Sequence, residues 1–119
     1  MTTDISFDPS PLRELIAELG EENTLNILRA FLADTAEKLE RIRAGEQGRV
    51  TIEREAHSIK SSAATFGFDG LSRVARKLES LANELTKPDL DEMCSRLRAV
   101  FEATQQFAHY ELLKDKAAA

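Results

Sequence analysis

Residues 52–67 read IEREAHSIKSSAATFG, and this stretch decides the fold. Its apolar residues recur at alternating spacings of four and three, which places them on one face of an α-helix. A glycine follows directly, at the position where a left-handed residue commonly ends a helix. The spacing therefore predicts a helix over residues 52–66, and its buried stripe consists of Ile52, Ala56, Ile59, Ala63 and Phe66.

The same periodicity continues on both sides of this stretch. Glycines and prolines interrupt it at intervals, and no segment shows the alternation of β-branched residues that is typical of strands. The sequence therefore predicts a single all-α domain over residues 1–119, an antiparallel up-down four-helix bundle with an additional short N-terminal helix. We expect the short helix at about 10–19 and the bundle helices at about 22–44, 52–66, 70–86 and 89–114.

Composition and charge exclude several classes of protein. The chain of 119 residues carries a formal net charge of -5 and has no block of lysines and arginines, which argues against nucleic acid as a partner. Its apolar runs are too short to span a membrane, and residues 1–9 contain no apolar signal segment. The single cysteine, Cys94, allows no internal disulfide. Together these features predict a cytoplasmic protein. We expect a monomer, because every apolar stripe is used inside one bundle.

His57 lies on the opposite side of its helix from the apolar stripe. An α-helix turns about 100° per residue, so the imidazole points roughly 140° away from the core. Ser61 and Ala64 follow on the same face and are small, which leaves the ring accessible to a partner. Lys60 flanks this face. Taken singly, each of these is an ordinary surface residue, and only their combination indicates a site.

The chemistry suited to this arrangement is phosphoryl transfer. An imidazole is a competent nucleophile because its neutral form is available near physiological pH. The ammonium of Lys60 could offset the charge of a phosphoryl group, which is about two negative charges. Glu79 directly follows the core residue Leu78, at the edge of the interface between the third and fourth helices. It is a candidate to accept a hydrogen bond from Nδ1 of His57, which would fix the tautomer and favour attack by Nε2.

The chain resembles the histidine-containing phosphotransfer (HPt) family. The family signature has a histidine, then any residue, an aliphatic residue, lysine, glycine, serine and small residues, with a glycine ten positions after the histidine. The opening segment, Leu15 to Phe31, also resembles the family. One departure is clear, because Ser61 stands where the family usually has glycine. The matching positions are His57, Ile59, Lys60, Ser62, Gly67 and the pair Leu78-Glu79.

The resemblance implies a role for each candidate residue. His57 would be the phosphoacceptor, Lys60 would stabilise the phosphoryl group, and Glu79 would hold the Nδ1 proton. Ser61 and Ala64 would form the docking surface, and the hydroxyl of Ser61 could donate to a phosphoryl oxygen. Phe68 could contribute to the same surface or instead pack into the core.

The resemblance also implies the partners. They would be response-regulator receiver domains and a sensor histidine kinase. The chain would be a carrier with no kinase activity of its own, and it would bind no cofactor or metal. Mg²⁺ would be supplied by the partner receiver domain.

We weigh three other functions against the phosphotransfer interpretation. A helical adaptor could bind a receiver domain or a kinase without accepting phosphate, and replacing His57 would then leave its role intact. A bundle-type metal site needs inward Glu-x-x-His pairs, whereas Glu53 lies four residues before His57 and His109 has no matching carboxylate pair. A serine hydrolase needs a strand–turn–helix elbow, which this sequence does not predict.

Overall fold

The computed structural model describes residues 5–43 and 48–114. Within these ranges the protein is all-helical, as predicted, and the only β-type pairing is an isolated bridge between Phe7 and Phe68. The elements in chain order are α1 (Pro9–Leu19), α2 (Glu21–Arg43), α3 (Arg49–Phe66), α4 (Asp69–Leu81), α5 (Lys87–Phe107) and a π-helical turn, η1 (Ala108–Leu112), that continues α5.

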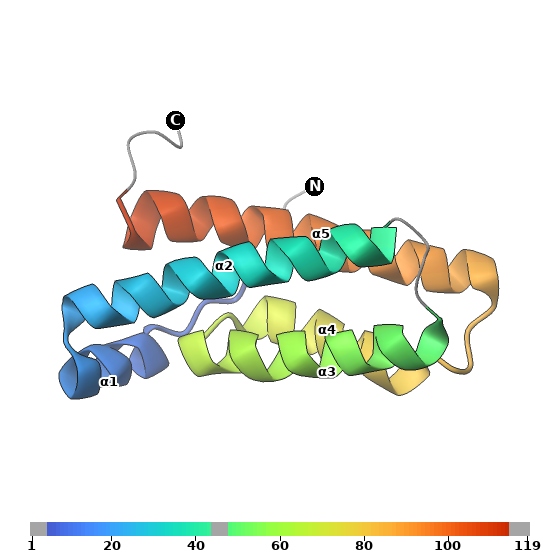
Figure 1. Ribbon diagram of the computed structural model, residues 1–119, viewed down its shortest axis with the longest axis horizontal. Coiled ribbons are helices and arrows are strands. Elements are labelled where there is room, and N and C mark those ends of the chain that lie inside the picture. Colours follow the sequence, from blue (N-terminus) through green and yellow to red (C-terminus); the bar gives the residue numbers. More distant parts are fainter. Residues whose placement is uncertain (1–4, 44–47, 115–119) are drawn as a thin grey trace.

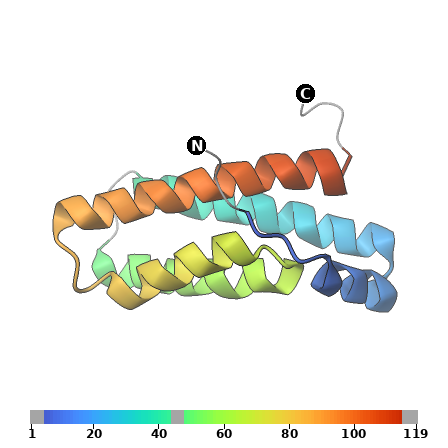
Figure 2. The same ribbon diagram turned by 180° about the vertical axis from the view of Figure 1, so that it is seen from behind.

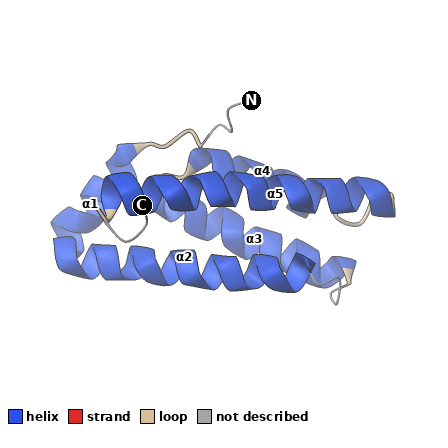
Figure 3. Ribbon diagram, turned by 90° about the horizontal axis from the view of Figure 1, so that it is seen from above, coloured by secondary structure: helices blue, strands red, loops and turns tan. Residues whose placement is uncertain are grey.

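The long helices form two layers. Helices α2 and α5 lie side by side in one layer, and α3 and α4 pair in the other (Figures 1 and 3). The short helix α1 lies beside the start of α2 at one end of the molecule (Figure 1). The apolar stripes meet between the layers, because each amphipathic helix must bury its apolar face against another element.

The buried face of α3 is the stripe that the sequence predicts. All five residues of that stripe are buried. Helix α4 buries Leu71, Ala75 and Leu78, and Ala82 just beyond it is buried as well. Among the described helices, none combines the length and the apolar character needed to cross a membrane.

Two helix boundaries differ from the expected ones in a way that matters for the surface. Helix α4 ends at Leu81, whereas we expected it to run to residue 86, and α3 begins at Arg49 rather than at residue 52. The extra first turn of α3 lets Nη1 of Arg49 donate to the carbonyl oxygens of Ala82 (2.8 Å) and Leu85 (2.6 Å). The carbonyl of Ala82, at the end of α4, has no partner within the helix, so its bond to Arg49 stabilises this end, and the bond to Leu85 fixes the turn that follows. The expected end of the second helix, Ala44, lies outside the described residues.

The N-terminal segment fastens the turn between α3 and α4. It runs along the end of this helix pair before entering α1 (Figure 2). The amide of Asp8 donates to the carbonyl of Gly67 (2.8 Å), and the amides of Asp69 and Gly70 donate back to the carbonyls of Ser6 (3.2 Å) and Ile5 (3.0 Å). These bonds fix the C-terminal end of the helix that carries His57.

Candidate functional site

His57 lies in the middle of α3 and faces solvent. Its side chain is 59 % exposed, while Ala56 before it and Ile59 after it are buried. The imidazole therefore contributes little to the core, and the helix holds it out from the surface. This orientation is the one predicted from the helical period.

Glu79 reaches His57 from the neighbouring helix, α4. Its Oε2 lies 2.6 Å from Nδ1 of His57, and its Oε1 accepts a hydrogen bond of 2.8 Å from Nζ of Lys60. A carboxylate can only accept hydrogen bonds, so Nδ1 must carry the proton in this contact. In the neutral ring the lone pair then lies on Nε2. The predicted proximity of Glu79 to His57 is confirmed, and one carboxylate holds both the imidazole and the lysine.

The pKa of Glu79 is lowered from its ordinary value. The main cause is the hydrogen bond from Lys60, and the hydrogen bond from His57 adds to it, while partial burial opposes both. Because the pKa is lowered, Glu79 remains a carboxylate at neutral pH. It is therefore available to accept the hydrogen bond from Nδ1 of His57.

The surface next to the imidazole is open and lined by small side chains. Ser61 and Ala64 are both exposed, as predicted. They line a hollow of about 450 Å³ that extends from α3 to α4. The remaining residues that line it are polar or charged, namely Lys60, Asp69, Ser72, Arg73 and Arg76. A partner that approaches His57 would therefore meet small side chains in the centre and charged side chains around them.

Phe68 does not belong to this surface, so its assignment to the docking surface was wrong. Its side chain is 0 % exposed and lies in an aromatic cluster with Phe7, Phe31 and Phe66. Gly67 adopts a left-handed conformation that directs the following residue inward, and the bridge to Phe7 holds it there. The alternative noted from the sequence, a core position at the helix end, is the observed one.

Comparison with known proteins identifies the family. The Hpt domain model matches residues 26–107, which include His57, Lys60 and Glu79. This match covers more than half of the chain. The chain belongs to the Hpt domain family. Helix α1 and the turn η1 lie outside the part of the chain that the Hpt domain model matches.

One curated relative is similar over nearly the whole chain. The phosphorelay protein LuxU of Vibrio harveyi is 27 % identical over 115 residues, which cover 92 % of this chain and 100 % of the relative. No solved structure matches the chain significantly.

Two further polar contacts join α3 to α4 and to the turn after it, on either side of His57. Glu53, one turn before His57, accepts a hydrogen bond from Asn83, one turn after Glu79. At the other side, the hydroxyl of Ser72 donates to the carbonyl of Lys60 (2.9 Å). Sequence reasoning missed Asn83 and Ser72. A signal was present in the spacing, because residues 53 and 57 are four apart and so are their partners 83 and 79, although Asn83 lies just beyond the end of α4.

A further contact links α3, next to His57, to α2. Nζ of Lys38 donates to the hydroxyl of Ser58 (2.8 Å) and lies 3.0 Å from a carboxylate oxygen of Asp34. Ser58 is the residue directly after His57, so α2 fixes α3 at the level of the imidazole. This contact was not predicted either, since Lys38 is remote in sequence. In the part of the chain that the structure describes, no three His, Cys, Asp or Glu side chains are placed to hold a metal ion.

Proposed function

We propose that this Hpt domain carries a phosphoryl group on Nε2 of His57 and relays it between response-regulator receiver domains, or from a hybrid sensor kinase to a response regulator. Membership of the Hpt domain family and the likeness to a phosphorelay protein support a phosphotransfer role. The single observation that carries the assignment to His57 is the geometry of its ring. Nδ1 is held by Glu79 at 2.6 Å, while the side chain as a whole is largely exposed.

The proposed step is an in-line displacement at phosphorus. The lone pair of Nε2 attacks the phosphoryl group of a partner's aspartyl phosphate, the new N–P bond forms, and the bond from phosphorus to the aspartyl oxygen breaks. The aspartate leaves as a carboxylate with its electron pair. Nδ1 keeps its proton, which Glu79 accepts as a hydrogen bond, so the positive charge that develops on the ring faces a carboxylate. The reverse step passes the group to a second receiver.

Little catalytic equipment is needed on the Hpt side, because phosphoryl transfer depends mainly on positioning and charge neutralisation. The ammonium of Lys60 has three N–H donors, and its contact with Glu79 uses one of them. The others could donate to phosphoryl oxygens, and the hydroxyl of Ser61 could do the same. Mg²⁺, supplied by the partner receiver domain, would neutralise the transferring oxygens.

The finer description of the molecule is part of the same proposal. The helices would form an antiparallel up-down four-helix bundle with α1 as the additional short helix. The domain would act as a monomeric cytoplasmic carrier without kinase activity. The colours of Figure 1 follow the sequence, and from α2 to α5 the chain direction that they give reverses from each helix to the next. This alternation supports the up-down arrangement.

The direct test is transfer from a panel of phosphorylated receiver domains. We expect the Hpt domain to become labelled by at least one donor, with a phosphate that is labile in acid and stable in base, as a phosphoramidate is. The fastest donor would identify the upstream partner. Failure to become labelled across the panel, with receiver binding still measurable, would refute the carrier proposal and favour the adaptor.

Removal of the Glu79 carboxylate should slow transfer without abolishing it. We expect Glu79→Ala to reduce the rate roughly 10- to 100-fold, by analogy with histidines that bind a metal, where loss of the hydrogen-bond partner has an effect of about this size. Glu79→Gln should lie between this variant and the wild type, since an amide oxygen can still accept from Nδ1 but carries no charge. Single-turnover transfer rates from one phosphorylated receiver measure the effect.

The matched control is Glu84→Gln, which removes an exposed carboxylate just beyond the end of α4. Its transfer rate should equal that of the wild type. A Glu79→Ala variant that transfers at the rate of this control would show that the contact with His57 has no part in the reaction.

A further inference from the structure

A second pocket lies at the end of the molecule where α2 ends and α3 and α5 begin. It has a volume of about 430 Å³, which falls within the range of small-molecule sites. Its apolar part comes from Ile42, Ile52, Leu90 and Cys94, which are buried. Burial raises the pKa of the Cys94 thiol, with Asp91 adding to the effect, so this wall is uncharged.

The charged residues that line the pocket are mostly cationic. Arg43, Arg49, Lys87 and Arg98 contribute four positive charges, and Asp91 contributes one negative charge, so these described residues sum to +3 (four minus one). The whole chain, in contrast, has a formal net charge of -5. Cations from three helices therefore surround one pocket in a protein whose net charge is negative. A cleft lined by charge of one sign concentrates ligands of the opposite sign.

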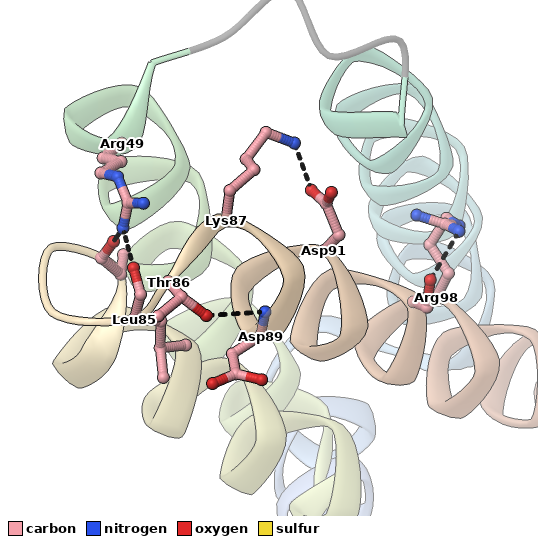
Figure 4. Close-up of polar contacts among 9 residues, drawn as sticks. Arg49, Leu85, Thr86, Lys87, Asp89, Asp91 and Arg98 are labelled. Atoms are coloured by element: carbon pink, nitrogen blue, oxygen red, sulfur yellow. Dashed lines mark hydrogen bonds and ion pairs between the residues drawn. The ribbon is translucent and has the colours of Figure 1, made fainter.

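The contacts of these cations leave donors available. Figure 4 shows Arg49 on α3 beside the row of Lys87, Asp91 and Arg98 on α5. Arg49 binds its two carbonyl partners through Nη1, and the guanidinium has further N–H groups on Nη2 and Nε. Lys87 contacts Asp91 at 2.6 Å, and Nη2 of Arg98 donates to the hydroxyl of Ser95 at 3.1 Å.

Local helix structure accounts for only part of this cluster. Arg43 lies in the last turn of α2, where a cation is favourable, and it contacts Glu40 at 3.2 Å. Arg49 donates hydrogen bonds to the carbonyl oxygens of Ala82 and Leu85, after the end of α4. Lys87, however, is the first residue of α5, where the helix dipole disfavours a cation, and its exposed ion pair with Asp91 stabilises little. Arg98 lies in mid-helix with one hydroxyl as its partner.

We propose that this pocket binds a small anion that carries phosphate groups. Arginine guanidinium groups match phosphate oxygens in pairs, and Lys87 supplies a point charge at the rim. The uncapped start of α3 at Gly48, which also lines the pocket, adds backbone N–H groups directed outward from the helix. Arg49 lies eight residues before His57 on α3, about 12 Å along the helix axis. The pocket is therefore a separate site, and the proposal does not depend on phosphoryl transfer.

The test is a titration of the ¹⁵N-labelled protein with sodium pyrophosphate at constant ionic strength, followed by amide chemical shifts. We expect saturable shifts confined to residues 42–43, 48–52 and 87–98, the segments that line the pocket. Sulfate at the same ionic strength should give a weaker response. Shifts spread over the whole surface, or no saturation, would overturn the proposal, and an equal response to sulfate would overturn the assignment to phosphate.

Two matched double variants make the test specific. Lys87→Gln with Arg98→Gln removes two cations from the pocket and should weaken pyrophosphate binding about tenfold or more, as expected for the loss of charge-assisted hydrogen bonds. Lys77→Gln with Arg96→Gln removes the same two residue types from exposed positions that do not line the pocket. Its affinity should change less than about twofold, the effect of net charge alone. Equal losses in both variants would overturn the proposal.

Discussion

Replacement of His57 by glutamine is expected to abolish phosphoryl acceptance and to leave the fold intact. Glutamine has no ring nitrogen with a basic lone pair, so no N–P bond can form at this position. The side chain of His57 is 59 % exposed, and substitutions at such sites usually change the free energy of unfolding by no more than about 0.5 kcal/mol. Labelling by a phosphorylated receiver and thermal unfolding of the same sample measure both effects.

The chain offers a matched control for this experiment, because it contains only two histidines. His109 lies in the π-helical turn η1, outside the part of the chain that matches the family. His109→Gln should therefore be labelled at the rate of the wild type. Labelling that persists in His57→Gln, or that disappears in His109→Gln, would place the phosphoacceptor elsewhere.

The same pair of variants separates a carrier from an adaptor. A carrier with His57→Gln should still bind its receiver, since Ser61, Ala64 and the surrounding charged residues are unchanged, but it should fail to pass on phosphate. An adaptor would keep its full biological role with this substitution. The two proposals thus differ in one measurable outcome, complementation by His57→Gln.

Much of the site could be predicted from the sequence because it depends on the period of single helices. The stripe of α3 fixes which face is buried, and the exposure of His57 follows from its angular offset. Glu79 could be placed beside it because it follows a core residue of the helix that pairs with α3. Both inferences use contacts between elements that are neighbours in the chain.

The features that escaped prediction depend on contacts between distant segments. The sequence placed Phe68 with the docking surface and left a core position open as the alternative. The N-terminal segment decides between them, because it brings Phe7 against the buried ring of Phe68. The early end of α4 is accompanied by hydrogen bonds from Arg49, which lies more than thirty residues away from the carbonyls it binds. The basic pocket combines residues from the ends of three helices. Periodicity says which face of a helix is buried, but it does not say which distant residues meet it.

Gly67→Ala is expected to cause a large loss of stability, well above that of an alanine substitution at Gly20 or Gly48. Gly67 has φ +85°, a conformation that costs an L-residue roughly 1–2 kcal/mol. A Cβ atom there would lie 2.0 Å from the carbonyl oxygen of Asp8, which is backbone and can move only if the N-terminal segment moves. Each of the three backbone hydrogen bonds of that segment contributes on the order of 1 kcal/mol. We expect the free energy of unfolding to fall by about 3–5 kcal/mol.

Gly48→Ala is the matched control for this loss, since a Cβ there meets nothing within 4 Å and the backbone has an ordinary negative φ. Urea denaturation of both variants measures the difference, and native-state hydrogen exchange locates it. The amides of Asp69 and Gly70 donate to Ser6 and Ile5, so they should lose protection in Gly67→Ala before the core of α3 does. Unchanged protection at these two amides would show that the N-terminal segment is not held by the close approach at Gly67. A selective loss would show that this approach fastens the end of the helix that carries His57.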